Sequence, residues 1–428
     1  MYDVVIVGGG AAGFYAAIHV AEARPKIKIA ILERGKEVLA KVKVSGGGRC
    51  NVTHAEFRPK ELASHYPRGE RELLGPFHSY ASGDTVEFFE KRGVDLKIEE
   101  DGRIFPTTDS SQTIINCLTS EAKKLGVQTF LLCSVTGIEP FTEENEKLWH
   151  VATTTQTFKT KKLLLATGSN LKVWKMLTQL GHNIITPVPS LFTFNIQDER
   201  IKHIPGLSTY AEVTVLDKKK SRRNYQKNSA QSEILFAEGP LLITHWGMSG
   251  PAILRLSAWG ARILESYNYS FRIKVNWVPE YHSDGLLELF MKVKQVEKKT
   301  ILRTKIVDVP KRLWASLVRA SGISDKLTWP EVSKIQLQEL ANQLTSGLFH
   351  VNGKSTFKEE FVTAGGVDLK DINFKTYESK IQPNLYFAGE ILNIDAITGG
   401  FNFQNAWTGG FIAAQGIVNG LSEIGENE

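Results

Sequence analysis

A cluster of glycines and one acid near the start of the chain have the types and spacing of a nucleotide site. A Gly-Gly-Gly-Ala-Ala-Gly motif at residues 8–13 directly follows the apolar run Val4–Val7, and Glu33 follows the motif by twenty residues. In such a turn the glycines allow a tight bend, a close approach to a pyrophosphate and close packing of a helix on a strand. The predicted contacts in this turn are Gly8, Gly10, Ala11, Ala12 and Gly13. The pattern indicates a dinucleotide site, and a plain loop with spare glycines is the alternative.

A strand–helix–strand unit is expected to position these residues. The apolar run leads into an alanine-rich helix, Ala11–Ala21, and a second strand, Ile27–Leu32, ends at the acid. The N-terminus of the helix would direct its amides and its positive dipole end at the phosphates. Glu33 could accept hydrogen bonds from an adenosine ribose, where an acid disfavours a 2′-phosphate. Glu33 and Arg34 are therefore the predicted contacts at this strand end.

A second glycine-rich segment follows, with three consecutive glycines, Gly46–Gly48, before an Arg-Cys-Asn sequence. Consecutive glycines cost backbone entropy that a plain loop would not need. We interpret this segment as a loop that contacts a flavin, with Arg49 meeting a phosphate or the ring and Cys50 near the reacting face. The predicted contacts are Gly48, Arg49, Cys50 and Asn51. A flexible surface loop with a buried, inert thiol is the alternative.

Two motifs near the other end of the chain could complete the site. A predicted strand ends at Gly389 and Glu390, which would place a carboxylate beside the ribityl chain of a flavin. The glycine-rich segment 398–405 leads into a predicted helix, Ala406–Val418. Its amides could face the N1–C2=O edge of the flavin, where reduction places negative charge, and stabilise it by roughly 1–2 kcal/mol. The predicted contacts are Gly389, Glu390, Gly399, Gly400, Phe401 and Asn402. A C-terminal helix with a flexible start is the alternative.

A further predicted contact lies at the end of a buried strand in the middle of the chain. The run Lys162–Leu165 is apolar and ends in a turn of small residues, Ala166, Thr167 and Gly168, where the backbone can pass close to a cofactor. Sequence periodicity also predicts a helix over Gly83–Arg92 and strands over Gly126–Glu139 and Trp149–Thr157.

The character of the chain changes at the linker Pro187–Ser190. Residues 191–278 have short alternating segments that predict a β-rich, barrel-like insert, and residues 284–345 have apolar residues at helical spacing. We therefore assign residues 1–188 and 352–428 to a discontinuous nucleotide-binding α/β domain, residues 189–280 to a β-rich subdomain and residues 281–351 to a helical subdomain. A split domain explains why the phosphate-binding and closing motifs lie at opposite ends.

Within the insert, residues 244–251 bring together a histidine, a tryptophan and two glycines. His245 could deliver a proton to one substrate carbon while a flavin delivers hydride to its neighbour. A hydrogen-bonded structural histidine is the alternative. Cys50 and His245 are the predicted catalytic residues, and Arg103 is a weaker candidate for anchoring an anionic or carbonyl group.

The composition is that of an ordinary globular protein, with a net charge of +6 and a pI near 8.9. The dense basic cluster Lys218–Lys227 and the lysine-rich stretch Lys292–Arg312 are either solvated or part of a surface for a polyanion. The three cysteines are widely spaced and form no CxxC motif, so neither a zinc site nor a disulfide framework is indicated, and the disulfide-reductase class of flavoenzymes is excluded. No apolar stretch approaches the roughly 20 residues that span a bilayer. The first strand begins at the first methionine, so we expect no signal peptide, no membrane contact and a cytoplasmic protein.

Five motifs together resemble the BaiN/RdsA-like bacterial flavoproteins. They are Ser45–Asn51, Gly102–Pro106, Thr244–Pro251, Thr363–Val367 and Ala388–Glu390. The resemblance spans nearly the whole chain and implies a FAD-binding domain of the glutathione-reductase type, interrupted by a β-barrel part and a small helical part. The chain departs from the family pattern at Asn393, where an acid is frequent, and at Tyr377, where a methionine is frequent.

The resemblance also implies NAD(P)H-linked, FAD-dependent reduction of an unsaturated substrate. In the first hypothesis NAD(P)H reduces FAD, and a conjugated C=C bond of a small molecule then receives hydride, with Cys50 or His245 supplying the proton. No second GxGxxG motif is present, so NAD(P)H would visit the flavin transiently. In the second hypothesis the substrate is a uridine of ribosomal RNA. In the third the protein is an RNA-binding or scaffold protein with a structural FAD. The oligomeric state stays open.

Overall fold

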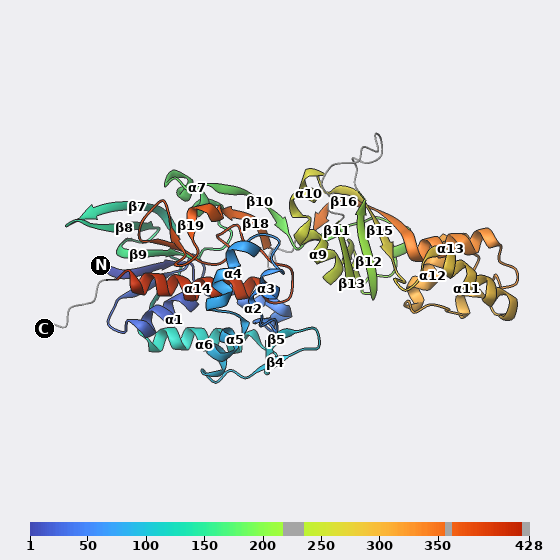
Figure 1. Ribbon diagram of the computed structural model, residues 1–428, viewed down its shortest axis with the longest axis horizontal. Coiled ribbons are helices and arrows are strands. Elements are labelled where there is room, and N and C mark those ends of the chain that lie inside the picture. The colour runs from blue at the N-terminus through green and yellow to red at the C-terminus, as the bar shows by residue number, and fades with distance from the viewer. Residues whose placement is uncertain (217–234, 356–361, 422–428) are drawn as a thin grey trace. The chain divides into compact units, whose positions relative to one another are not determined.

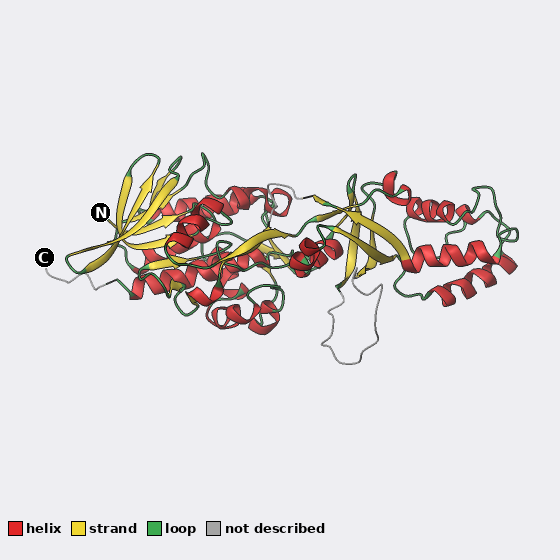
Figure 2. Ribbon diagram, turned by 90° about the horizontal axis from the view of Figure 1, so that it is seen from above, coloured by secondary structure: helices red, strands yellow, loops and turns green. Residues whose placement is uncertain are grey.

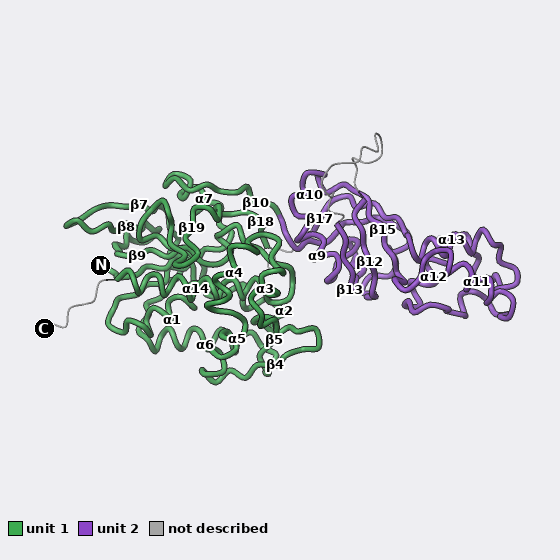
Figure 3. Tube along the Cα trace, in the orientation of Figure 1, with its two compact units in different colours: residues 1–188, 358–428 green, residues 189–357 purple. Residues whose placement is uncertain are grey.

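The computed structural model describes residues 1–216, 235–355 and 362–421. The chain divides into two compact units, residues 1–188 with 358–428 and residues 189–357 (Figure 3). The predicted basic cluster Lys218–Lys227 lies outside the described residues. No helix in the described ranges is both long and apolar enough to cross a membrane.

The first unit is built on a sheet whose central strands run in the order β19-β20-β21-β9-β1-β2-β6 (Figure 1). The pairs β1–β2, β1–β9, β2–β6 and β9–β21 are parallel, and β7 and β8 extend the sheet as an antiparallel hairpin on β9. The strands are β1 Tyr2–Val7, β2 Ile29–Leu32, β6 Gln128–Phe130, β7 Val135–Glu143, β8 Glu146–Thr153, β9 Thr157–Leu165, β19 Ile372–Asn373, β20 Glu378–Ser379 and β21 Leu385–Phe387. Strands β1 and β2 therefore have the parallel arrangement that the predicted strand–helix–strand unit requires, and β9 and β21 continue it.

Two helices from opposite ends of the chain pack against each other beside this sheet. They are α1 Ala11–Ala23 and α14 Phe401–Asn419, and Figure 1 shows them side by side. Small residues permit the contact, since a Cβ on Gly410 would lie 2.8 Å from the backbone oxygen of Ala12. This packing brings the N-terminal glycine motif and the C-terminal glycine motif into the same unit.

The other helices of the first unit carry or support the loops between the strands. They are α2 Ala40–Gly48, α3 Pro59–Ala63, α4 Glu70–Ser79, α5 Ser82–Glu90, α6 Ser111–Lys124 and α7 Leu171–Gln179. A small antiparallel sheet joins β3 Thr53–His54, β5 Arg103–Pro106 and β4 Leu96–Ile98, and β10 Ile184–Ser190 pairs with β18 Val362–Val367. The small sheet holds the segment that follows the second glycine-rich motif.

Four predicted elements of the first unit differ from the structure. The strand predicted over Trp149–Thr157 ends at Thr153, where the chain turns from β8 into β9. The single strand predicted over Gly126–Glu139 is wrong, because the chain turns between β6 and β7, with Leu132 at a left-handed φ of 53°. The C-terminal helix begins at Phe401, five residues before the predicted start. The segment Gly46–Gly48 is counted within α2, but the helix breaks there, since Ser45, Gly46 and Gly47 have non-helical backbone angles.

The second unit contains a seven-stranded antiparallel sheet in the order β16-β15-β12-β13-β14-β11-β17 (Figure 2). Its strands are β11 Thr193–Asn195, β12 Ser208–Leu216, β13 Phe236–Ile243, β14 Gly247–Ser249, β15 Ser270–Asn276, β16 Gly347–Asn352 and β17 Lys354–Ser355. Buried and exposed residues alternate along β15, with Phe271, Ile273 and Val275 fully buried, as in a sheet with one face on a core.

Helices complete the second unit. The short α8 Glu199–Lys202, α9 Pro251–Trp259 and α10 Ala261–Ser266 lie within the segment predicted to be β-rich, so that prediction missed them. The predicted helical stretch contains α11 Ser283–Val296, α12 Lys311–Ala320 and α13 Lys334–Ser346. The lysine-rich stretch Lys292–Arg312 runs from the end of α11 to the start of α12. The α/β fold class predicted from the sequence is confirmed.

Candidate cofactor site

The turn between β1 and α1 is closed by glycines that no other residue could replace. Gly8 has a φ of 113°, and a Cβ there would lie 2.3 Å from the backbone oxygen of Ala166. A Cβ on Gly13 would lie 2.0 Å from the backbone oxygen of Gly8. Gly10 differs, because its φ of −95° suits any residue and an added Cβ would meet no atom within 4 Å. The turn is therefore closely packed at Gly8 and Gly13. It leaves open space at Gly10, beside the N-terminus of α1.

The acid at the end of β2 is held against this turn. The Glu33 carboxylate accepts hydrogen bonds from the backbone N–H of Gly9, at 2.9 Å, and of Gly35, at 2.7 Å. The backbone oxygen of Glu33 accepts from the N–H of Cys133, at 2.8 Å. Arg34 is exposed beside it. Glu33 thus lies next to the glycine turn, where a ribose hydroxyl would need an acceptor.

The predicted turn after β9 and the predicted acid after β21 lie on the other side of the motif. The backbone of Ala166 meets Gly8, and a Cβ on Gly168 would lie 3.7 Å from Oε2 of Glu390. Glu390 accepts a hydrogen bond from the N–H of Thr363, at 3.2 Å, and pairs with the ammonium group of Lys41. The structure therefore brings together residues 8–13, 166–168 and 389–390.

The start of α14 is joined to the segment after the second glycine-rich motif. Gly400 has a φ of 95°, and a Cβ there would lie 2.6 Å from the backbone oxygen of Thr53. The side-chain amide of Asn51 lies 3.0 Å from both the N–H of Gly400 and the oxygen of Thr53, and the orientation that satisfies both accepts from Gly400 and donates to Thr53. Residues 51–53 therefore pack directly against Gly400, at the start of α14.

Aromatic stacking fixes the first helical residue of α14. The buried ring of Phe401 is stacked on His54, with centroids 4.6 Å apart, and on His65, with centroids 4.2 Å apart. The next residue, Asn402, uses its amide to bind the N–H of Ala396, at 3.0 Å, and the oxygen of Ala396, at 3.2 Å. The side chains of Phe401 and Asn402 thus fix where α14 begins. Their contact with a flavin stays a prediction.

Arg49 is engaged by acids of the protein. Its guanidinium donates to Glu99, at 2.6 Å, lies 3.4 Å from Asp109 and stacks 3.9 Å above the ring of Phe105. Arg103, the weaker candidate, donates to Asp101 at 2.7 Å and to Glu99 at 2.9 Å. Two neighbouring glycines stay open, since a Cβ on Gly47 or Gly48 would meet no atom within 4 Å. The predicted contact of Arg49 with a phosphate or ring stays a prediction, while its described partners are carboxylates.

Cys50 is fully buried, with a left-handed φ of 63°. Burial raises the pKa of its thiol to about 12, so the thiol is neutral over the physiological range. Because the thiolate is the reactive form, we expect Cys50 in the folded protein to react with iodoacetamide at pH 8 on the order of a thousandfold more slowly than an unperturbed cysteine. Peptide mapping after timed labelling measures the rate. Labelling as fast as that of the urea-unfolded chain would contradict this account of the thiol.

His245 lies in the second unit, in the turn between β13 and β14. The turn is closed by a hydrogen bond from the N–H of Thr244 to the oxygen of Gly247, at 2.8 Å, and His245 is exposed. The neighbouring Trp246 is also exposed, at 61%. Cys50 belongs to the first unit and His245 to the second. The catalytic roles of both residues stay predictions.

Sequence reasoning missed several residues that the structure places at this site. Lys41 pairs with Glu390, and Arg68 forms a two-pronged ion pair with the fully buried Asp395. His54 and His65 hold Phe401. The partners in each ion pair are more than 300 residues apart, so no local pattern could join them. Thr363 belongs to the motif Thr363–Val367, one of the five that carry the family resemblance. That motif could have pointed to Thr363 as a site residue.

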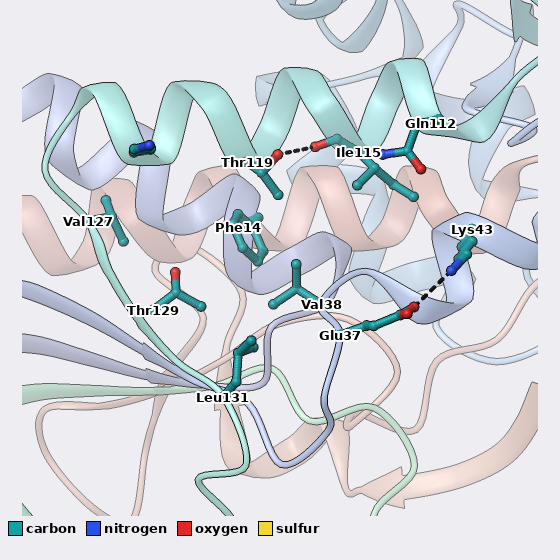
Figure 4. A pocket seen from close by; sticks show the side chains of 11 residues that line it. Phe14, Glu37, Val38, Lys43, Gln112, Ile115, Thr119, Val127, Thr129 and Leu131 are labelled. Carbon is teal, nitrogen blue, oxygen red and sulfur yellow. Dashed lines mark hydrogen bonds and ion pairs between the residues drawn. The ribbon is translucent and has the colours of Figure 1, made fainter.

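A cavity of about 610 Å³ opens between α1, α6 and β6 (Figure 4). An ion pair between Glu37 and Lys43, at 2.9 Å, lies at its edge. Its lining is Phe14, Glu37, Val38, Lys43, Gln112, Ile115, Thr119, Lys123, Val127, Thr129 and Leu131. None of these residues is a predicted cofactor contact, but Val38 also packs beside Gly9, so the cavity borders the glycine turn.

The residues at the glycine turn fit an FAD. The open side of Gly10 is a cradle that a side chain would fill, and the adjacent N-terminus of α1 favours an anion. Glu33 and Glu390 supply acceptors for sugar-type hydroxyls on the two sides of the turn. Among the described residues, the buried hydroxyl oxygen of Thr363 makes no hydrogen bond, and it belongs to the residue whose N–H binds Glu390. A polyhydroxyl chain at Glu390 would satisfy it.

Three comparisons with known proteins agree with this fold. The family profile described as "HI0933-like protein Rossmann domain" matches residues 2–416. A ribosomal RNA dihydrouridine synthase from Haemophilus influenzae is 27% identical over 96% of this chain and 98% of that protein. A 3-dehydro-bile acid delta(4,6)-reductase from Clostridium scindens is 25% identical over 97% of this chain and 98% of that protein.

The solved structure of 3-ketosteroid-delta4-(5alpha)-dehydrogenase from Rhodococcus jostii has the same fold. It superposes with a TM-score of 0.51 at 12% identity, over 97% of this chain and 96% of that chain. This likeness supports the Rossmann-type FAD-binding fold of the chain. Because the family profile matches nearly the whole length, this chain belongs to the HI0933-like protein Rossmann domain family.

Proposed function

We propose that this protein is a FAD-dependent reductase that transfers hydride from NAD(P)H to a conjugated C=C bond. The observation that carries the proposal is the joining of the two chain ends. Gly8 meets Ala166, Gly168 lies beside Glu390, and α14 packs on α1. This arrangement gives the protein a phosphate turn, an acceptor for sugar hydroxyls and a helix N-terminus within one unit. One relative is named as a 3-dehydro-bile acid delta(4,6)-reductase, and reduction of a C=C bond is the chemistry that this name describes.

Each element has a defined task in this proposal. The amides at the N-terminus of α1 bind the pyrophosphate, and Glu33 accepts from the adenosine ribose. Glu390 accepts from the ribityl hydroxyls. The N-terminus of α14, fixed by Asn51 and Thr53, stabilises negative charge on the pyrimidine edge of the ring by roughly 1–2 kcal/mol. FAD, when bound, supplies the two-electron chemistry that no side chain can supply.

Cys50 and His245 stay the two candidate proton donors, and Cys50 is the less favourable of them. The Cys50 thiol is buried and its pKa is raised to about 12, so it gives up a proton poorly near neutral pH. His245 is exposed, and a histidine imidazole is a common general acid. Trp246, exposed in the same turn, offers an indole face on which a planar ring could stack.

A uridine of ribosomal RNA is the second candidate acceptor. Ribosomal RNA dihydrouridine synthases from Haemophilus influenzae and Escherichia coli are 27% and 26% identical over 96% and 97% of this chain. The C5=C6 bond of uracil is conjugated with a carbonyl, so its reduction belongs to the same reaction class. The lysine-rich stretch Lys292–Arg312 could hold a phosphate backbone, which predicts binding that weakens steeply with salt.

Anaerobic reduction followed by reoxidation tests the proposal. We expect NADH or NADPH to bleach the flavin absorbance near 450 nm, and an unsaturated acceptor to restore it in stoichiometric amount. Ribosomal RNA from a strain lacking the protein should lack a dihydrouridine if uridine is the acceptor, and an unchanged RNA directs the search to small enones. A flavin that no nicotinamide reduces would contradict the proposal and favour the structural-FAD alternative.

A further inference from the structure

An ion pair spans the candidate cofactor site from one wall to the other. The ammonium group of Lys41, in α2, binds Oε2 of Glu390, which follows β21. The two residues are 349 positions apart. We call this contact the Lys41–Glu390 bridge. The side chains are 53% and 19% exposed, so the bridge lies at the surface of the site and is open to exchange.

Each partner of the bridge stands beside the glycine turn. On one side, the N–H of Leu39 donates to the oxygen of Gly9, at 2.8 Å, and a Cβ on Gly9 would lie 3.0 Å from Val38. This places the start of α2, and with it Lys41, next to the turn. On the other side, Glu390 lies beside Gly168, as described above. The bridge therefore joins the two segments that flank the turn.

The charges at this site leave an anionic cofactor in need of a cation. Glu33 and Glu390 each place a carboxylate beside the turn, whereas a pyrophosphate brings about two further negative charges. The first turn of α1 carries no charged side chain, so the helix contributes only its dipole, about half a charge. Among nearby cations, Lys43 pairs with Glu37 and Arg49 pairs with Glu99, while Arg34 is exposed at the end of β2, on the Glu33 side of the turn. Lys41 is the lysine of α2 whose ammonium group is directed to the site.

We propose that Lys41 binds the pyrophosphate of FAD, and that the Lys41–Glu390 bridge exchanges when the cofactor enters. The ammonium group passes to a phosphate oxygen, and the carboxylate passes to a ribityl hydroxyl. Each charged group thus leaves one partner for another and neither is left buried and unpaired. This inference rests on FAD being the cofactor of the proposed function, and it adds a residue that the sequence motifs do not include.

A thermodynamic cycle on the full-length chain tests it. Oxidised FAD is titrated into apoprotein of the unaltered chain, Lys41→Met, Glu390→Gln and the double variant, with flavin fluorescence as the readout. Lys41→Met should weaken FAD binding about 10- to 100-fold, the usual effect of losing a charged hydrogen bond. The same Lys41 substitution should still weaken binding about tenfold or more in the Glu390→Gln background. No further loss in that background would overturn the proposal, since Lys41 would then act only through Glu390.

The chain offers a matched control. Lys43 belongs to the same helix, is equally exposed at 53% and also pairs with a glutamate, so Lys43→Met should leave FAD affinity within about twofold. Lys41→Arg should retain most of the affinity because it keeps the charge. Equal losses from Lys41→Met and Lys43→Met would also overturn the proposal. The titrations need no electron donor or acceptor, so their outcome is independent of the reaction assigned above.

Discussion

A chain carrying Gly10→Val is expected to fold normally and to retain no FAD. The backbone at Gly10 has a φ of −95°, which valine adopts readily, and an added Cβ would meet no protein atom within 4 Å. The same side chain would fill the space in which a pyrophosphate approaches the N-terminus of α1. We expect the affinity for FAD to fall on the order of 100-fold or more, because a side chain forced into a close contact destabilises the complex.

Absorbance at 450 nm after desalting, with circular dichroism as a check on folding, measures this result. Gly285→Val is the matched control, since an added Cβ there also meets nothing within 4 Å, and it lies in α11 of the second unit. Gly13→Val should instead disrupt folding, because its Cβ would overlap the oxygen of Gly8. A Gly10→Val protein that stays yellow would refute our placement of the phosphate turn.

Loss of the Arg68–Asp395 ion pair is expected to produce the largest change in stability. Asp395 is fully buried, and Nε of Arg68 donates to its Oδ1 at 2.5 Å while a second guanidinium nitrogen binds Oδ2. Arg68→Met would leave the carboxylate buried without this partner, which costs about 3–5 kcal/mol of unfolding free energy. Because the pair lies just before α14, bound FAD should also be released at lower urea concentration.

Urea titration followed by flavin release and by circular dichroism measures both effects. The double variant Arg68→Met with Asp395→Leu should recover part of the loss, since it also removes the buried carboxylate. Lys91→Met breaks an exposed pair with Glu87 and should cost less than about 1 kcal/mol. If Arg68→Met were no more destabilising than Lys91→Met, the pair would not be holding this segment.

The N-terminal part of the site could be predicted from the sequence because its determinants are local. The apolar run before Gly8, the alanine-rich helix after it and Glu33 at the end of β2 all lie within one strand–helix–strand unit. Each glycine is required by a contact within a few residues or by the ligand. The structure adds the backbone of Ala166 as the tight neighbour of Gly8.

Other features depend on contacts between distant segments. The early start of α14 follows from stacking of Phe401 on His54 and on His65, which lie more than 300 residues earlier in the chain. The turn between β6 and β7 depends on a left-handed residue, Leu132, which is not a type that signals a turn. The short helices α9 and α10 lie between strands in the sequence. The alternation of apolar and polar residues in those strands obscured the helical spacing of apolar residues in α9 and α10. Tertiary packing decided these three features.

The ion pairs at the site were beyond any sequence pattern. Lys41 and Arg68 are two of 52 basic residues, and nothing near them in the sequence distinguishes them from a solvated lysine or arginine. Their partners, Glu390 and Asp395, lie more than 300 residues away in the sequence and are brought close by the fold. Only the folded chain reveals these assignments.

The central claim is that the two ends of the chain together form a site for one FAD. The most direct measurement is the flavin content of the purified full-length protein, before and after incubation with excess FAD. We expect a flavin spectrum at one FAD per chain, with AMP and FMN appearing in equal amounts after phosphodiesterase digestion of the released cofactor. A folded, colourless protein that takes up no added FAD would contradict the claim.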